Sequence, residues 1–173
     1  MTAAFPELQA SVRRRTATAD AIEELVRARH ADLLRVATAI AGSREGGRDA
    51  VQEGLSRALA ARATFRGSGT LEAWVWRTVV NAARNVRARS PLVAESREVA
   101  FAVDPPDDRR DAVREAVAQL PERQRLALFL RYYADLDYAT IATALGVRRG
   151  TVSATLSHAH DALRRLLAEE VLT

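Results

Sequence analysis

The segment LDYATIATALGVRRGTVSATLSHAHDALRRLL, residues 136–167, decides how the C-terminal part of this chain folds. Asp137 is a residue type that caps helices, so it predicts a helix that starts at Tyr138. Gly146 predicts the end of this short helix, and a second helix is expected to begin near Arg148. Two helices joined by a three-residue turn form the outline of a helix-turn-helix. In that motif the second helix enters the DNA major groove.

Apolar residues recur at helical spacing over most of the remaining chain. From residue 22 to residue 89 this spacing predicts three or four helices, separated by the Gly-containing segments GSREGG (42–47) and FRGSG (65–69). Helical spacing resumes at Asp111 and is interrupted at Pro121. No segment alternates apolar and polar residues as a half-buried strand does. We therefore expect an all-α chain with two small helical domains.

Residues 90–109 lack this periodicity. They contain Pro91, Pro105 and Pro106, and their acidic residues outnumber Arg. This composition favours an extended linker between the two domains. The predicted boundaries are an N-terminal extension at 1–21, a first domain at 22–89, the linker at 90–109 and a second domain at 110–173.

The charge of the chain is unevenly distributed. Its basic residues are 26 Arg and no Lys. Residues 1–89 carry 15 Arg and 9 acidic residues, a net charge of +6, whereas residues 90–173 carry 11 Arg and 13 acidic residues, a net charge of −2. Electrostatic attraction for nucleic acid is therefore expected mainly in the N-terminal half.

Composition also excludes several classes of protein. The chain has no Cys, which removes disulfides, thiolate nucleophiles and Cys-bearing zinc sites. No apolar run approaches the roughly 20 residues that cross a bilayer. The N-terminal segment places its Arg residues after its apolar residues, the reverse of a secretory signal. We expect a cytoplasmic protein without a membrane partner.

The segment TLEAWVWRTVVNAARNVRAR, residues 70–89, predicts a helix with two different faces. With successive residues 100° apart, one face is apolar. It carries Val75, Val79, Ala82, Ala83 and Val86. The opposite face combines an aromatic ring, guanidiniums and amides, which suits single-stranded DNA because these groups stack on bases, bind phosphates and read base edges. It carries Trp74, Arg77, Asn81, Arg84 and Asn85. The alternative is a solvated polar face with Trp74 turned back into the core.

Two sets of motifs resemble those of one known family. DAVQEGLSRAL (49–59), ATFRGSG (63–69) and AWVWRTVVNAARNVRAR (73–89) occur in the order and spacing of the second conserved region of extracytoplasmic-function (ECF) sigma factors, which belong to the sigma-70 family. Residues 116–167 resemble the fourth conserved region, with its L-P-x-x-x-R and G-T-V motifs. The resemblance implies a subunit that binds core RNA polymerase and directs promoter recognition, promoter melting and transcription initiation.

The resemblance also implies roles for particular residues of the first domain. The residues expected to bind the clamp helices of the largest polymerase subunits are Asp49, Gln52, Glu53 and Arg57. The residues expected at the minus-ten promoter element are Arg66, Gly67 and Ser68, in a loop that accepts a flipped base, and Trp74, Arg77, Asn81, Arg84 and Asn85, on the helix that faces the melted strand. Extrusion of a base costs a few kcal/mol, which such a pocket and its phosphate contacts return.

The second domain has the motifs of the family's fourth region, but it departs from the family on the face of its last helix that is expected to read DNA. Family members place this domain on the polymerase flap and read the minus-thirty-five element with its last helix, which usually carries several Arg or Lys after G-T-V. Here neutral or weakly basic residues stand at four of these positions. The residues expected to face this element are Arg148, Arg149, Thr151, Ser153, Thr155 and His158. Fewer cations imply fewer phosphate contacts and weaker binding.

Other functions explain the sequence less completely. An enzyme is not expected, because no nucleophile elbow, P-loop or paired-carboxylate motif occurs. No cofactor is predicted, and no metal either, since His158 and His160 are two residues apart and point to different sides of a helix. The main alternative is a stand-alone helix-turn-helix regulator, which leaves DAVQEGLSRAL and the helix at 70–89 unexplained. The expected partners are core polymerase, promoter DNA and an anti-sigma protein that covers the two domains.

Overall fold

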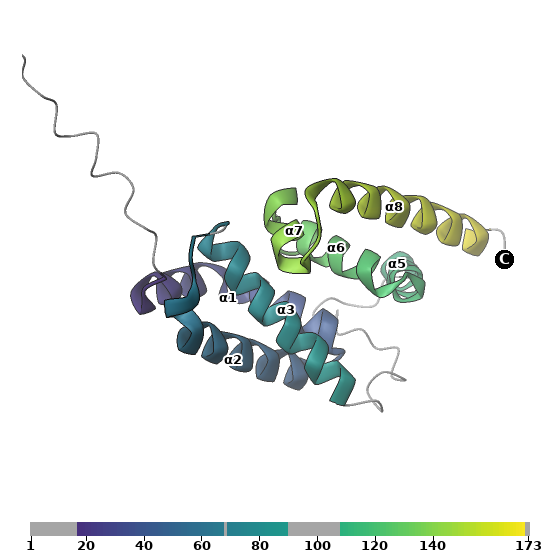
Figure 1. Cartoon of the computed structure of the whole chain (residues 1–173). Helices are drawn as coiled ribbons and strands as arrows, with labels where there is room; N and C mark the ends of the chain where they lie inside the picture. Colours follow the sequence, from purple (N-terminus) through teal and green to yellow (C-terminus); the bar gives the residue numbers. More distant parts are fainter. Residues whose placement is uncertain (1–16, 68, 90–107, 172–173) are drawn as a thin grey trace, which may run out of the picture.

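The computed structural model describes residues 17–67, 69–89 and 108–171. The described chain is all-α, without a strand in these ranges, and its helices form two lobes (Figure 1). The first lobe consists of α1 (Ala19–Ala41), α2 (Arg44–Ala61), the short 3-10 helix η2 (Arg62–Thr64) and α3 (Leu71–Arg89). The second lobe consists of α5 (Asp108–Gln119), α6 (Glu122–Tyr132), α7 (Tyr138–Leu145) and α8 (Arg149–Val171).

The predicted helical fold is therefore confirmed. Helix α1 begins three residues before the predicted start of the first domain, and α5 begins two residues before the predicted start of the second. Most of the predicted extension at 1–21 and linker at 90–109 lies outside the described residues. Among the described helices, none is long and apolar enough to cross a membrane.

Local capping sets the limits of the helix-turn-helix, as its sequence predicts. The Asp137 carboxylate accepts a hydrogen bond of 2.7 Å from the Thr140 backbone N–H, which caps the start of α7. This bond lowers the pKa of Asp137. Gly146 ends α7 with a φ of 68°, in the left-handed region that glycine adopts without strain. Helix α8 then begins at Arg149, one residue from the predicted position.

Two glycines allow the helices of the first lobe to approach closely. A Cβ atom added to Gly47 would lie 2.7 Å from the Cα atom of Thr38 on α1. A Cβ atom added to Gly54 would lie 2.7 Å from the Cα atom of Val79 on α3. Real side chains do not tolerate such distances to backbone atoms. The two glycines thus hold α2 in direct backbone contact with its neighbours, which fixes the position of α3.

The two lobes pack against each other instead of standing apart. Helix α3 packs on α1 and α2 of its own lobe and on α7 of the second lobe, and α1 also contacts α6 (Figure 1). One continuous cluster of buried apolar side chains includes members of both lobes, from Leu33 on α1 to Ala159 on α8. The sequence predicted the two lobes but not this shared core.

Helix α3 is buried on more than the one predicted side. Val75, Val79, Ala82 and Ala83 are buried as expected. A second set of buried residues, Ala73, Trp76 and Val80, lies at an angle to the first on the helix. Trp76 is the largest fully buried side chain described, with 1% of its surface exposed. This second apolar side accounts for the packing of α3 against two lobes at once.

Candidate nucleic-acid interface

The polar face of α3 is largely solvent-exposed. Arg77, Asn81, Arg84 and Asn85 are all exposed, while most of the apolar residues of the helix are buried. Residues 77, 81 and 85 are four apart, so they lie above one another along the helix. The face therefore presents one guanidinium and two amides in a row, with the Arg84 guanidinium beside it.

Trp74 supports this face from its edge. The Trp74 side chain is half-buried and packs in a small second cluster with Phe65, at 5.5 Å between ring centroids. Trp74 therefore joins a core, as the alternative interpretation expects, and also keeps part of its surface exposed. Thr70 caps α3 next to it, because its hydroxyl oxygen accepts a hydrogen bond of 3.0 Å from the Ala73 N–H.

The loop before α3 has the conformation that its glycines allow. Gly67 has a φ of 73° and Gly69 a φ of 91°, both in the region that favours glycine. Arg66 and Gly67 are exposed, so their donors are open to solvent. Ser68, the third residue predicted to meet a flipped base, lies outside the described residues.

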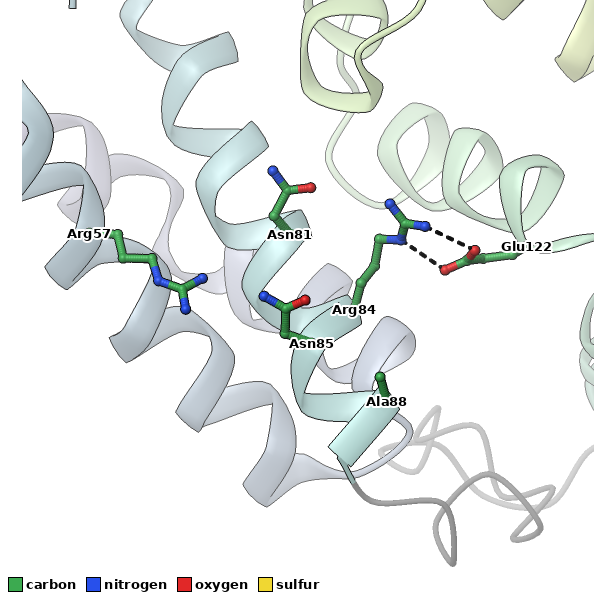
Figure 2. Close-up of a pocket in the computed structure, with 6 residues that line it drawn as sticks. All are labelled: Arg57, Asn81, Arg84, Asn85, Ala88 and Glu122. Carbon is green, nitrogen blue, oxygen red and sulfur yellow. Dashed lines mark hydrogen bonds and ion pairs between the residues drawn. The ribbon is translucent and has the colours of Figure 1, made fainter. Parts of the chain in front are cut away.

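Arg84 reaches across to the second lobe. Its Nε and Nη2 atoms donate to the two carboxylate oxygens of Glu122, at 2.9 and 3.3 Å (Figure 2). Glu122 is the first residue of α6. Beside this pair lies an open pocket of about 600 Å³, which is lined by Arg57, Asn81, Arg84, Asn85, Ala88 and Glu122 (Figure 2). The two amides of the polar face therefore open onto the junction between the lobes.

The face of α2 predicted to bind polymerase is also accessible. Asp49, Gln52 and Arg57 are exposed, and Glu53 is partly buried. Glu53 forms an ion pair with Arg57 one turn further along α2, and its second oxygen lies 3.8 Å from Nη1 of Arg89 on α3. Arg57 also lines the pocket with Asn81 and Asn85, so the predicted polymerase face and the predicted DNA face meet at this residue.

Helix α8 has an exposed face that carries most of the residues predicted to meet DNA. Arg148, Arg149, Ser153 and His158 are exposed. Thr151 and Thr155 are partly buried, and the Thr155 hydroxyl donates to the Thr151 carbonyl oxygen at 2.7 Å. These two residues therefore stand at the edge of the face, because they lie toward the buried side of α8 with Val152 and Leu156. The centre of the exposed face of α8 is formed by Gly150, Ala154, Ser157 and Asp161.

The chain matches known proteins over both lobes. Family profiles described as Sigma-70 region 2 and Sigma-70, region 4 match residues 9–90 and 110–166. The ECF RNA polymerase sigma factor SigM of Mycobacterium tuberculosis is 31% identical over 151 residues, which are 85% of this chain and 77% of that protein. The chain belongs to the ECF sigma factors. The RNA polymerase sigma-H factor of Pseudomonas aeruginosa is also similar, at 30% identity over 138 residues, 69% of this chain and 72% of that protein.

Two solved structures share the fold of this sigma factor. The structure of CnrH in complex with the cytosolic domain of CnrY has a TM-score of 0.66 at 20% identity, and it covers 88% of this chain and 90% of that chain. The sigma factor RpoE of Bartonella quintana, solved in complex with the anti-sigma factor NepR, has a TM-score of 0.61 at 23% identity, over 84% of this chain and 98% of that chain. At this identity the likeness concerns the fold alone.

Sequence reasoning missed the residues that join the lobes of this sigma factor. Arg29 on α1 forms ion pairs with Asp32 and with Glu72 on α3, and its Nη2 atom donates to the Ala134 carbonyl oxygen of the second lobe at 2.6 Å. Glu122 holds Arg84 in the same way. No sequence motif marks the contacts between the lobes, because Arg29 and Ala134 are 105 residues apart along the chain and Arg84 and Glu122 are 38 apart.

Burial where the lobes meet also shifts the pKa values of Tyr133 and Arg125. Burial raises the pKa of the Tyr133 phenol to about 12, although the positive charges of Arg114 and Arg35 act in the opposite direction. Burial, together with the positive charge of Arg87, lowers the pKa of Arg125. Arg35 and Arg87 belong to the first lobe, whereas Tyr133 and Arg125 belong to the second. The lobes are thus close enough to influence each other electrostatically.

The two histidines of α8 have different surroundings. His158 is exposed. His160 lies against α6, where its Nε2 atom is 2.8 Å from the Tyr132 hydroxyl and the two rings meet edge to face. Within the described residues, no group of three or more His or acidic side chains is placed to hold a metal ion.

Proposed function

We propose that this sigma factor binds core RNA polymerase through α2, reads the melted minus-ten strand with α3 and its preceding loop, and reads the minus-thirty-five element with α8. The observation that carries this proposal is the exposed row of Arg77, Asn81 and Asn85 on a helix whose other sides are buried. A rigidly held polar row is a surface on which nucleic acid binds without further ordering of the protein.

The residues of α3 suit a single strand better than a duplex. Guanidiniums bind phosphates, and amides offer both a donor and an acceptor to the exposed edge of an unpaired base. The Gly67 and Gly69 loop beside Trp74 lets the backbone approach the strand closely. We infer that this loop, with Arg66 and Ser68, receives the flipped base of the minus-ten element.

The proposed polymerase contacts use the remaining exposed faces. Asp49, Gln52, Glu53 and Arg57 form a charged and polar strip along α2, which we assign to the clamp helices. The second lobe is assigned to the flap, with α8 turned toward the DNA. Helix α8 lies on the side of its lobe away from α1–α3, so the reading face stays accessible when the lobes are packed together (Figure 1).

The function does not require a catalytic or cofactor site of the chain's own. We infer that it acts in the cytoplasm as a specificity subunit, and that polymerase supplies the chemistry. A further partner is an anti-sigma protein, since the RpoE structure of similar fold was solved with the anti-sigma factor NepR. The rival function, a stand-alone helix-turn-helix regulator, has no use for the α2 strip or the α3 row.

Run-off transcription with core polymerase on genomic fragments tests the proposal and identifies the promoter. We expect Asn81→Ala to reduce open-complex formation about fivefold or more, because one good base contact contributes about 1–3 kcal/mol. Its affinity for core polymerase should be unchanged. Gln119→Ala, on the exposed surface of α5, is the control. An equal loss in both assays would contradict the role of Asn81, and failure to co-purify with core polymerase would favour the stand-alone regulator.

A further inference from the structure

The contact between Arg84 and Glu122 has the form of a phosphate contact. The guanidinium donates two parallel hydrogen bonds to two oxygens of one anion, at 2.9 and 3.3 Å. Arginine binds phosphates with the same fork geometry, because phosphate oxygens have a similar spacing and charge. In this structure a carboxylate of the second lobe therefore stands where a strand phosphate would bind Arg84.

The surroundings of this contact belong to the proposed DNA path. Asn81 and Asn85 of the exposed row line the pocket beside the ion pair, together with Arg57 (Figure 2). Glu122 and the start of α6 form the wall that the second lobe contributes. A strand that follows the row of amides toward Arg84 must therefore meet Glu122.

The second lobe is held in this position by several independent contacts. Arg29 donates to the Ala134 carbonyl oxygen in the turn between α6 and α7. Gly69 lies near Thr143 on α7, since a Cβ atom added there would be 3.8 Å from the Thr143 hydroxyl oxygen. The buried cluster shared by the lobes adds apolar packing. Glu122 is thus presented to Arg84 by a docked lobe and does not approach it as a free side chain.

We propose that Glu122 is an internal competitor of DNA, which occupies the phosphate site of Arg84 while the lobes are packed together. The proposal rests on the assignment of α3 to the melted strand and adds a form of control to it. Binding of the strand replaces Glu122 by a phosphate and releases the start of α6 from α3. The second lobe then loses one of its attachments at the moment when the first lobe binds DNA.

The strength of this competition follows from exposure of the pair. The side chains of Arg84 and Glu122 are 49% and 47% exposed, so solvent screens much of their attraction. An exposed pair of this kind changes an equilibrium by roughly two- to fivefold. A competitor of that strength restrains weak binding to arbitrary single strands and is readily displaced by a promoter strand held by polymerase.

A double-mutant cycle on the full chain tests the competition. The probe is a fluorescently labelled single-stranded DNA oligonucleotide, whose affinity is measured by anisotropy at constant salt. We expect Glu122→Gln to raise the affinity roughly two- to fivefold. Glu115→Gln, which removes an exposed carboxylate on α5, is the matched control for net charge. In an Arg84→Gln background the gain from Glu122→Gln should disappear, because no guanidinium remains to compete for.

The movement of the lobe has a separate readout. Because the chain has no Cys, single cysteines at the exposed positions Ser56 and Gln119 allow a donor and an acceptor dye to be attached to the two lobes. Saturating oligonucleotide should lower energy transfer between the dyes. Circular dichroism of each variant checks that the helical fold is retained.

Two outcomes would overturn the competition: an equal gain from Glu115→Gln, or a gain that persists in the Arg84→Gln background. Energy transfer that the oligonucleotide leaves unchanged would refute the release of the second lobe. Run-off transcription by the wild-type protein separates this from the proposed function. Transcription without any effect of Glu122→Gln on strand affinity refutes the competition alone. A wild-type protein that neither supports transcription nor binds the oligonucleotide refutes both.

Discussion

Adding one cation to the reading face of α8 should change how salt affects DNA binding. Ser153 is exposed on this face, whose centre is formed by the uncharged residues Gly150, Ala154 and Ser157 and by Asp161. Ser153→Arg supplies one more phosphate contact, and each such contact adds about 0.9 to the slope of log affinity against log salt. The affinity gained at 50 mM salt should therefore shrink about 3.5-fold at 200 mM.

The assay is fluorescence anisotropy of a labelled DNA duplex with the full-length protein across this salt series. The duplex need not contain a promoter, because phosphate contacts do not depend on base sequence. Gln119→Arg is the control, since it adds the same charge to an exposed position of α5 in the same lobe. An unchanged slope for Ser153→Arg, or an equal change for both variants, would refute the assignment of this face of α8 to DNA.

Two further predictions concern stability, measured by chemical denaturation. Gly54→Ala should lower the free energy of unfolding by about 1–3 kcal/mol, because its Cβ atom would collide with the backbone at Val79. Gly150→Ala should cause no loss, since a Cβ atom there meets nothing within 4 Å, and an equal loss in both variants would contradict the reasoning. Asp137→Ala should lower the free energy of unfolding by about 0.5–2 kcal/mol at pH 7, because the hydrogen bond that caps α7 at the Thr140 N–H is lost. Asp137→Asn should keep most of this stability, since its amide oxygen can accept the same hydrogen bond. The folded-state pKa of Asp137 is depressed, so its charged contribution is present above the unfolded pKa and lost as pH falls through the folded value. The gap between wild type and Asp137→Ala should therefore narrow in strong acid, and a gap independent of pH would exclude the charged cap.

The local features of the fold could be predicted from the sequence because each depends on neighbouring residues. The cap at Asp137 and the left-handed turn at Gly146 are set within one helical turn. The apolar side of α3 follows from the 3.6-residue period, and Val75 and Val79 are buried as that period requires. The same period placed Arg77, Asn81 and Asn85 on the exposed side.

Residue type and spacing were less informative about the edges of each face. The sequence predicted that Thr155 faces DNA. In the structure Thr155 is partly buried, and its hydroxyl donates a hydrogen bond to the Thr151 carbonyl oxygen. Asp161 lies on the exposed face of α8 and forms an ion pair with Arg164, with 2.7 Å between Asp161 Oδ1 and Arg164 Nη1. Small and polar residues give no strong hydrophobic periodicity, so the sequence does not show where the exposed face of such a helix ends. That boundary depends on which neighbouring helices cover its sides.

Tertiary structure alone decided how the two lobes meet. The apolar face predicted for α3 did not include Trp76 and Val80, which are buried in the structure, where α3 packs on α7 as well as on α1 and α2. Arg84 and Glu122 are 38 residues apart in the chain, and Arg29 and Ala134 are 105 apart. Contacts of this kind depend on how whole helices are oriented, and no local periodicity encodes that orientation. The sequence by itself therefore determined the family, the helices and the exposed polar row. Only the tertiary structure determined that the Glu122 carboxylate of the second lobe binds the Arg84 guanidinium beside this row.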